Sequence, residues 1–385
     1  MKIRVVDTES GFDALEEEWN RLSETTPASI FSSFDYVRIA WKHFHKPTDR
    51  LFILVFSDEA SILGIAPFYI RRSAKWGIPY RIIRLIASWE GDRPRILHTR
   101  SARETWSTML NFLEKDFADW EALELIEQPI EGLTGVGWSF LFRSGWYWES
   151  QPDSVDYYIS PEGSWEKFLI SLSSTTRRNW RKQTRRLSAA PGGYAVERIA
   201  DPGRVREALA RFKAIEQSGW KAQAKIGVAK DERHQRFYDD LVIHLADKGQ
   251  VVFHFLTTGQ DDAAGCFSFS CRNVIYGRHI AYSPAYAAYS PGMIILAEWA
   301  REGFVGPWQE LDLLGVKEDG SSYNYKRHWA TGKRETIRWI GFRVWSRLLP
   351  LIAAKRLKRL FAKQPLCAAE GFDVPVTVAS DSHDD

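Results

Sequence analysis

Tyr289-Ser290-Pro291-Gly292-Met293 is a helix start that follows directly on a run of strand-like segments. Ser290 is predicted to cap the helix, Pro291 to take its first position, and the apolar residues that follow to continue it until Gly303. The N–H groups at a helix start favour an anion, and Gly292 would let a ligand lie against the backbone. The stretch therefore predicts a helix whose N-terminus can bind a phosphate-bearing ligand.

Strand-like segments lie on both sides of this helix start. Before it, three segments are joined by short turns: Val251–Leu256, Ala264–Cys271 and Val274–Tyr282. After it, a further apolar segment surrounds Leu311–Leu314. Three antiparallel strands, a helix and a returning strand predict an α+β (α/β) domain, in which a mixed, mostly antiparallel sheet is flanked by helices.

The N-terminal part of the chain repeats this order. Segments with strand character occupy Leu51–Phe56, Ile62–Ile70, Arg81–Ala87 and Glu121–Ile126, and Ala102–Phe117 has helical periodicity. The corresponding segments lie roughly 190–200 residues further on, which fits two copies of one domain rather than a solenoid.

The two copies differ at the helix start. In place of Ser-Pro-Gly, the first copy has Trp89–Arg95, a loop of mixed charge. We therefore expect the anion site only in the second copy. The first copy is expected to form one wall of an acceptor cleft.

Four segments of the second copy resemble a known family. They are Ala281-Tyr282-Ser283-Pro284, Tyr289-Ser290-Pro291-Gly292, Leu311-Asp312-Leu313-Leu314-Gly315 and Tyr325-Lys326-Arg327-His328-Trp329. Through them the chain resembles GNAT-type acyltransferases, and in particular the CelD-like branch, which is related to the FemAB peptidoglycan transferases. The resemblance covers roughly residues 10–335 and is more specific in the second half of the chain.

This resemblance implies tandem GNAT-like domains at residues 1–160 and 161–340. In the second domain, the pyrophosphate of acetyl-CoA or another acyl-CoA would be held by Ser290, Pro291, Gly292 and Met293. The implied activity is transfer of the acyl group to an amine or hydroxyl of a cell-envelope or polysaccharide precursor, a small molecule or a glycan precursor. Two alternatives stay open: a FemAB-like transferase that uses aminoacyl-tRNA, and a non-catalytic adaptor at the membrane surface.

Three side chains are candidates for the chemistry of acyl transfer, which needs a polarised carbonyl and a proton acceptor. Asp312 lies between two leucines of the returning strand and is the first candidate for the general base; otherwise it is a structural carboxylate. Tyr282 could protonate the leaving thiolate or simply pack. Lys326 could bind an anionic group, hold Asp312 by charge, or lie at the surface. The family often has aspartate where this chain has Ser283, so that position receives no role.

Residues Trp165–Leu187 are predicted to form one basic helix between the copies. Its basic residues recur at i, i+1, i+4 and i+5 and cover one side: Arg177, Arg178, Arg181, Lys182, Arg185 and Arg186. This side is either solvated or binds anions such as CoA phosphates, a phosphorylated acceptor or a lipid headgroup. Interleaved aromatic residues are absent from it, so we do not expect nucleic acid.

Three of these arginines, Arg177, Arg178 and Arg181, are the predicted substrate-binding residues of the basic helix. Trp220 and Lys221 resemble the tryptophan-plus-basic position at the lip of the family's acceptor cleft, and are added to them. Otherwise Trp220 belongs to the core and Lys221 to the solvent.

Composition restricts the class of protein. With 52 basic and 49 acidic residues and 44% hydrophobic residues, the 385-residue chain can bury a large core and is not a polyanion binder as a whole. Its three cysteines do not form a disulfide framework, and the spacing of its histidines and cysteines predicts no metal site. No signal peptide or spanning helix is expected, so the predicted location is cytoplasmic.

The C-terminal extension, residues 341–364, is basic and amphipathic. Phe342–Lys363 contains no acidic residue and includes Trp345 among its apolar residues. Such a helix either lies on the inner face of the membrane or docks on the protein body. Residues 365–385 are predicted to be a disordered tail.

Overall fold

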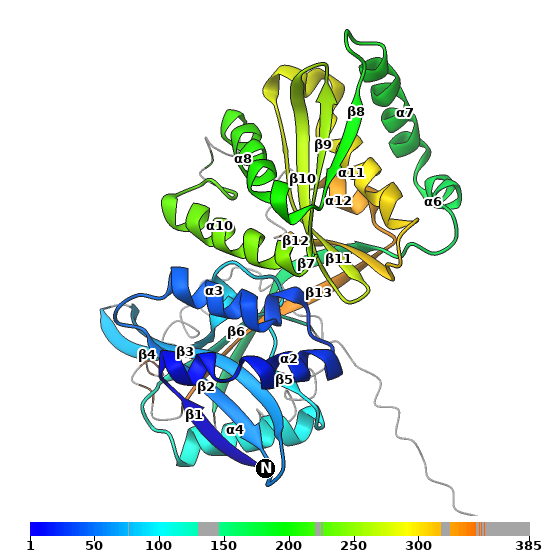
Figure 1. Ribbon diagram of the computed structural model, residues 1–385. Helices are drawn as coiled ribbons and strands as arrows, with labels where there is room; N and C mark the ends of the chain where they lie inside the picture. Colours follow the sequence, from blue (N-terminus) through cyan, green and yellow to red (C-terminus); the bar gives the residue numbers. More distant parts are fainter. Residues whose placement is uncertain are drawn as a thin grey trace, which may run out of the picture.

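The computed structural model describes residues 1–75, 77–129, 146–219, 226–316 and 324–343, together with positions 224, 346, 348 and 350. Strands from both parts of the chain form one mixed sheet, in the order β1-β2-β3-β4-β6-β13-β7-β12-β11-β10-β9-β8, with β5 beside β3. Figure 1 shows the helices on either side of this long twisted sheet. The fold class predicted from the sequence, α+β with a mostly antiparallel mixed sheet, is confirmed.

The N-terminal half, residues 1–160, contributes seven described strands. They are β1 (Lys2–Val6), β2 (Arg50–Ser57), β3 (Ile62–Lys75), β4 (Ile78–Leu85), β5 (Leu97–His98), β6 (Ala122–Pro129) and β7 (Tyr147–Ile159). Its described helices are α1 (Glu9–Asp13), α2 (Glu16–Thr25), α3 (Phe34–Phe44) and α4 (Ala102–Lys115), with short 3-10 turns η1 (Ile30–Ser32) and η2 (Ile86–Trp89).

The C-terminal half, residues 161–340, has the corresponding elements. Its strands are β8 (Ala195–Ile199), β9 (Val251–Thr258), β10 (Asp261–Cys271), β11 (Val274–Tyr282), β12 (Glu310–Val316) and β13 (Gly332–Phe342). Its described helices are α6 (Trp165–Ser171), α7 (Ser174–Ser188), α8 (Pro202–Ser218), α10 (Glu232–Asp247), α11 (Pro291–Gly303) and α12 (Asn324–Trp329), with a 3-10 turn η3 (Pro284–Tyr289).

The two halves exchange their last strands. β13 pairs with β6 of the N-terminal half, and β7 pairs with β12 of the C-terminal half. The two exchanged strands also pair with each other along most of their lengths. In Figure 1 the orange strand β13 accordingly reaches from the C-terminal half in among the N-terminal strands. The predicted boundary near residue 160 falls at the end of β7, so the sheet continues across it.

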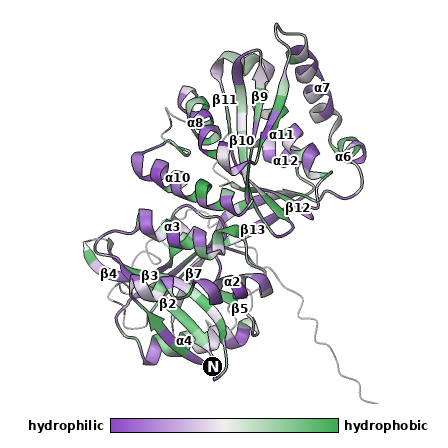
Figure 2. Cartoon of the chain, viewed as in Figure 1, coloured by the Kyte–Doolittle hydropathy of each residue, from purple (hydrophilic) through white to green (hydrophobic). Residues whose placement is uncertain are grey.

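One hydrophobic core is shared by both halves. Helices α2, α3, α8 and α10 cover one face of the sheet, and their buried side chains form a single cluster with residues of both halves. The other face is covered separately, by α4 in the N-terminal half and by α6 and α11 in the C-terminal half. Figure 2 shows the hydrophobic residues concentrated in the strands. Because burial of apolar surface drives folding, the shared core ties the two halves into one body.

The predicted basic helix 165–187 is broken into two helices, which corrects the sequence-based prediction. Leu172 is extended, and the Ser173 side chain accepts a hydrogen bond from the Thr176 N–H and so caps α7. A serine that caps a helix competes with continuation of the preceding one.

The predicted C-terminal helix does not begin at Phe342, because Phe342 is the last residue of β13. Just after it, Arg343 donates a hydrogen bond to the Ala118 carbonyl at 2.9 Å and lies over the Trp120 ring. Buried Leu348 packs with Phe342 and Ile82. The beginning of the extension thus contacts the N-terminal half, and most of Phe342–Lys363, like the predicted tail, lies outside the described residues.

Candidate active site

A pocket opens where two neighbouring strands separate. β11 and β12 pair in parallel over only three positions, which end at Tyr276 and Asp312. Beyond them β11 continues to Tyr282, and β12 continues to Val316 beside β7 instead. A pocket of about 430 Å³ lies between the separated strands and is closed by α11 and α12. Its volume falls within the range of sites for small ligands.

A β-bulge in β11 sets which side chains reach this pocket. Gly277 is paired with Ser268 and His279 with Phe267, so Arg278 is the extra residue of the bulge. A bulge bends a strand and re-aims its side chains. Gly277, Arg278 and His279 all line the pocket.

The start of α11 forms one end of the pocket, as the sequence predicts. Ser290, Pro291, Gly292 and Met293 all line it. A Cβ at Gly292 would touch the Tyr282 ring at 3.4 Å, which is an ordinary contact. Glycine therefore leaves room for a ligand here without being required for packing.

Ser290 stands at the N-cap position, but the prediction that its side chain caps the helix is wrong. Its backbone is left-handed, with φ 52° and ψ 53°, and its side chain makes no capping hydrogen bond. A side-chain cap needs an extended residue at this position. The Ser290 carbonyl instead accepts from the N–H groups of Met293, at 3.0 Å, and Ile294, at 3.3 Å.

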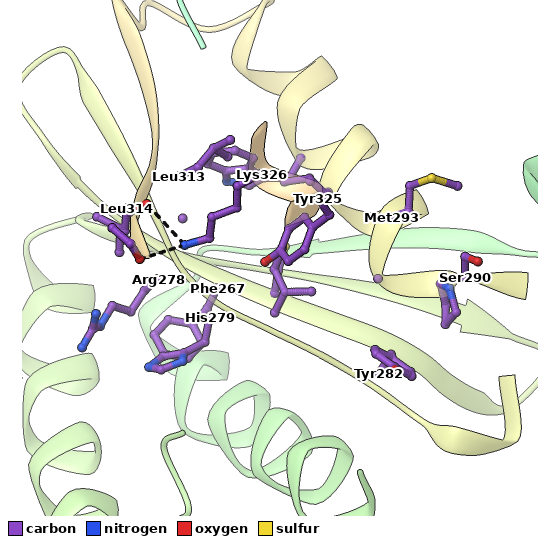
Figure 3. A pocket seen from close by; sticks show the side chains of 18 of the residues that line it. Phe267, Arg278, His279, Tyr282, Ser290, Met293, Leu313, Leu314, Tyr325 and Lys326 are labelled. Carbon is purple, nitrogen blue, oxygen red and sulfur yellow. Dashed lines mark hydrogen bonds between the residues drawn. The ribbon is translucent and has the colours of Figure 1, made fainter. Parts of the chain in front are cut away.

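Lys326 lies at the other end of the pocket. Its Nζ donates to the carbonyls of Leu314, at 3.4 Å, and Gly315, at 3.5 Å (Figure 3). Burial lowers the pKa of Lys326 to about 8, although the charges of Asp92, Asp312 and Asp156 oppose this. An ammonium group with such a pKa is a strong hydrogen-bond donor near neutral pH.

Tyr282 also lines the pocket, but it does not lie beside Lys326. Figure 3 shows Tyr282 at the end with Ser290 and Met293, and Lys326 at the opposite end, with Tyr325 between them. Two of the side chains predicted to take part in the chemistry, Tyr282 and Lys326, therefore lie at opposite ends of the pocket.

Asp312 is buried and held by arginines. One of its carboxylate oxygens pairs with Arg93 and, at 3.5 Å, with Arg334. The other accepts a hydrogen bond from the Leu314 N–H at 2.8 Å. Asp312 itself is only 1% exposed and does not line the pocket, although Leu313 and Leu314, which follow it, do.

The hydrogen bond that Asp312 accepts from Leu314 also links Asp312 to Lys326. Leu314 has a left-handed backbone, with φ 63°, which costs energy for a residue with a side chain. The carboxylate of Asp312 stabilises this turn through the Leu314 N–H. The carbonyl of the same turn then accepts the hydrogen bond from Lys326. Asp312 is thus connected to Lys326 through the backbone of Leu314.

The N-terminal half contributes a wall to the pocket. Asp92, from the loop of mixed charge, lines it and pairs with Arg278 at 2.8 Å. Arg278 is buried and also donates to the Glu90 carbonyl at 2.5 Å. Part of the site is therefore built by the loop that replaces the helix start in the first copy.

The predicted substrate-binding arginines are dispersed. Arg177 donates to the carbonyls of Ile170 and, at 2.9 Å, Leu172, so it caps the end of α6. Arg178 and Arg181 are exposed on α7 and do not line the pocket. Trp220 and Lys221 lie outside the described residues.

One arginine of the basic helix does approach the start of α11. Arg186 donates to the Ala288 carbonyl at 3.0 Å, and its guanidinium lies 5.4 Å from the centre of the Tyr289 ring. Ala288 and Tyr289 belong to η3, directly before Ser290. The basic helix is therefore connected to the pocket at the end predicted to hold phosphates.

Sequence reasoning missed Asp92, Arg278 and His279 as pocket residues. An arginine inside the apolar β11 is a usable signal, because a buried charge needs a partner. The bulge, however, interrupts the alternation by which side chains are assigned to faces.

Among the residues that the structure describes, no group of histidine, cysteine and acidic side chains could hold a metal ion. Within the same ranges, every helix is too short or too polar to cross a membrane.

Comparison with known proteins agrees with the fold. Residues 174–327 match the family model described as an acetyltransferase (GNAT) domain, and this match includes α11, the separated strands and Lys326. A search of curated protein sequences found no match.

Three solved structures have the same overall fold. The chain is similar to FemX, with a TM-score of 0.64 and 11% identity over 91% of this chain and 100% of the other. It is also similar to a conserved protein of unknown function from Bacteroides thetaiotaomicron, with a TM-score of 0.55, 10% identity and coverage of 89% and 100%. The third is the C-terminal domain of a putative lysylphosphatidylglycerol synthetase from Agrobacterium fabrum, with a TM-score of 0.52, 9% identity and coverage of 90% and 97%.

At sequence identities of 9–11%, the similarity to these three structures shows the fold alone. The fold is GNAT-like, and the C-terminal half carries the segment that matches a GNAT acetyltransferase domain. Together they support an acyltransferase. The assignment to the CelD-like branch stays a prediction.

Proposed function

We propose that the protein is an acyltransferase that takes its acyl group from acetyl-CoA or another acyl-CoA. The observation that carries this proposal is one pocket between separated strands, with the start of α11 at one end and Lys326 at the other. The family match to a GNAT acetyltransferase domain covers both ends.

The donor would lie along the separated strands. The start of α11 offers a positive helix end to the pyrophosphate, and Gly292 leaves space for it. Beyond Tyr276, β12 no longer pairs with β11, so the β11 edge can form backbone hydrogen bonds with the amide groups of a pantetheine arm. The thioester would then lie toward the end that contains Lys326.

Lys326 would stabilise the negative charge that develops on the thioester oxygen. Its ammonium is held at this end of the pocket by two backbone carbonyls, which accept its hydrogen bonds. A donor that is already in place costs no reorganisation during the reaction. We assign Asp312 the role of positioning Lys326, through the Leu314 turn, instead of the base role predicted from the sequence.

The acceptor would enter beside the N-terminal half. Asp92 lines the pocket and could attract an amine or bind a hydroxyl. As acceptor we propose an amine or hydroxyl of a cell-envelope or polysaccharide precursor. The cytoplasmic location, with contact to the inner face of the membrane through residues 342–363, stays part of this proposal.

A second candidate donor is aminoacyl-tRNA. The exposed arginines of α7, together with the contact between Arg186 and the residues before Ser290, favour a long anion near the helix start. Such binding would weaken steeply with salt, whereas binding of a single CoA would weaken less.

A thermal-shift experiment tests the donor. Acetyl-CoA, longer acyl-CoAs and free CoA are added to the wild type, to Gly292→Glu and to Gly292→Ala. A ligand at 100 times its Kd stabilises the folded state by about 2.7 kcal/mol, which raises Tm by several degrees. We expect this shift in the wild type and in Gly292→Ala, whose methyl group fits.

In Gly292→Glu the added charge and bulk should abolish the shift. Ala210→Glu is a matched control, because Ala210 is exposed on α8 and distant from the pocket lining. If no acyl-CoA shifts the wild type at millimolar concentration, the proposed donor is wrong.

A further inference from the structure

We propose that Trp299, which lines the pocket, restricts the donor to acyl-CoAs with a short acyl group, such as acetyl or propionyl. The inference rests on the proposed function, because it names the class of acyl-CoA that the same pocket takes. It follows from the way in which α11, β11 and β12 close one end of the pocket.

Helix α11 runs along the pocket from one end to the other. Near its start, a Cβ at Gly292 would lie 3.4 Å from the Tyr282 ring and 3.9 Å from Ile280. Further along the helix, the Trp299 ring lies 3.4 Å from the position of a Cβ at Gly277. At 1.5 Å per residue, the two helix positions are about 10 Å apart. Trp299 therefore lies far from the end predicted to hold the donor phosphates.

The pocket end at Trp299 and Gly277, called the inner end below, is the place where the strands come together. Tyr276 and Asp312 are the last paired positions of β11 and β12, and Gly277 is the first residue of β11 beyond them. A Cβ at Gly277 would also lie 3.6 Å from the Asp312 carbonyl oxygen. The Trp299 ring thus covers the point at which the two strands separate.

The Trp299 ring is fixed in this position. Its Nε1 donates a hydrogen bond to the buried Ser268 Oγ at 3.2 Å, and Ser268 is the partner of Gly277 across β10 and β11. Trp299 is only 3% exposed. Rotation of the ring away from the strands would leave a buried N–H without its acceptor, which is costly. The ring therefore acts as a rigid wall.

The neighbours of Trp299 in the pocket lining are also core side chains. Leu296 and Leu313 line the pocket, are 1% and 3% exposed, and belong to the same hydrophobic cluster as Trp299. A core packed in this way resists the insertion of further methylene groups. Figure 3 shows Leu313 beside Lys326, at the end where the thioester would lie. A long acyl chain that extends from there toward the inner end would have to displace these side chains.

Binding of an acyl-CoA series to the full chain tests the inference. Isothermal titration measures Kd for acetyl-CoA, butyryl-CoA and hexanoyl-CoA, with free CoA as the reference for the part that all donors share. In the wild type, the Kd of hexanoyl-CoA should exceed that of acetyl-CoA by at least about 10-fold, because a single methylene can change recognition by a hydrophobic pocket by about 10-fold or more.

Two substitutions should relax this preference. Trp299→Phe shortens the wall and should lower the Kd of hexanoyl-CoA by about 10-fold relative to that of acetyl-CoA. Ser268→Ala keeps the indole but removes its hydrogen bond, so the same ratio should change in the same direction by about 2-fold to 10-fold. This milder variant keeps the inference testable if Trp299→Phe does not fold.

Trp165→Phe is the matched control. Trp165 is a buried tryptophan of the same hydrophobic cluster, but it does not line the pocket. The same substitution at this position should keep the wild-type preference for the short chain. A relaxed preference in Trp165→Phe as well would show a general loosening of the core and would overturn the role of Trp299.

The outcomes separate this inference from the proposed function. If the wild type binds acetyl-CoA and hexanoyl-CoA equally well, or if neither Trp299→Phe nor Ser268→Ala changes the ratio, the inference fails and the proposed donor stands. If the wild type binds no acyl-CoA and no free CoA, the proposed function fails and the inference with it.

Discussion

Each half of the sheet contains one short parallel strand pairing, but the two halves differ in how far the first strand of the pair continues beyond it. In the N-terminal half, β4 pairs in parallel with β6 over three positions, from Ile82 to Arg84. In the C-terminal half, β11 pairs in parallel with β12 over three positions as well. β4 then ends after one further residue, at Leu85, whereas β11 runs on to Tyr282. The extension of β11 is one wall of the pocket.

The segment that replaces this extension in the N-terminal half serves the other half. After β4 the chain turns through η2 into Glu90, Asp92 and Arg93. Asp92 lines the pocket, Glu90 holds Arg278 and Tyr238, and Arg93 holds Asp312. The pocket therefore lies mainly in the C-terminal half, and residues of the N-terminal half support it.

Each half also contains a buried acid at the matching position, with a different partner set. Glu124 of β6 pairs with Arg84 and Arg338. Asp312 of β12 pairs with Arg93 and Arg334, but Arg93 must also neutralise Asp156, at 2.8 Å. The exchanged strand β13 supplies an arginine to each acid. The C-terminal arrangement is the more vulnerable, because Arg93 serves two buried carboxylates, whereas each arginine beside Glu124 serves one.

The largest expected effect follows from this difference. Arg93→Met leaves Asp312 and Asp156 buried and short of a partner, and should cost about 3–5 kcal/mol in the free energy of unfolding. Arg84→Met should cost clearly less, since Arg338 remains beside Glu124. Urea unfolding of both variants measures the two costs, and equal costs would remove the asymmetry between the halves.

The second effect concerns the amine at the pocket end. Lys326→Met should lower kcat by about 10²–10³-fold, as removal of an oxyanion donor does. In the wild type, the rate should fall as pH rises through about 8, because the lowered pKa lets Lys326 lose its charge there.

The Lys326→Arg variant tests whether the loss of charge on Lys326 causes the decline of the rate at alkaline pH. Arginine stays charged, so any activity that this variant retains should persist above pH 8. An unchanged alkaline decline in Lys326→Arg would mean that another group titrates.

A smaller effect distinguishes two acids on β6, half-buried Glu127 and buried Glu124. Burial, together with the charge of Asp92, raises the pKa of Glu127 to about 8 from its ordinary value of 4.5. The favourable contribution of the protonated form is complete below pH 4.5 and is lost as pH rises through 8. Glu127→Gln should therefore be more stable than the wild type at pH 9, by about 1 kcal/mol or more.

Glu124→Gln is the matched opposite case, because Glu124 is held by two arginines. This variant should be less stable than the wild type at pH 9. Thermal unfolding from pH 5 to pH 9 compares the two, and a shift of the same sign in both would contradict this account of their environments.

Local patterns were sufficient to predict one part of the fold. The strands before the helix start were predicted nearly to their ends, because their apolar runs are bounded by turns. The exchanged strands β7 and β13 were not predicted. β7 contains Glu149, Asp153 and Asp156, so it lacks the apolar run of a central strand. Its pairing with β12 depends on residues far away in the sequence.

The same dependence on residues far apart in the sequence explains which parts of the site could be predicted and which could not. The start of α11 and Lys326 carry local signals, and the structure places both at the pocket. The surroundings of Asp312 depend on Arg93, which lies 219 residues earlier in the chain, and no local pattern connects them. His279 reaches the pocket after a bulge that depends on pairing with β10.

The central claim is that only the C-terminal half binds an acyl donor. Isothermal titration of the full chain with acetyl-CoA measures both affinity and stoichiometry. We predict one molecule bound per chain, with binding lost in Gly292→Glu and kept in Gly292→Ala. Two molecules per chain, or undiminished binding in Gly292→Glu, would contradict the claim.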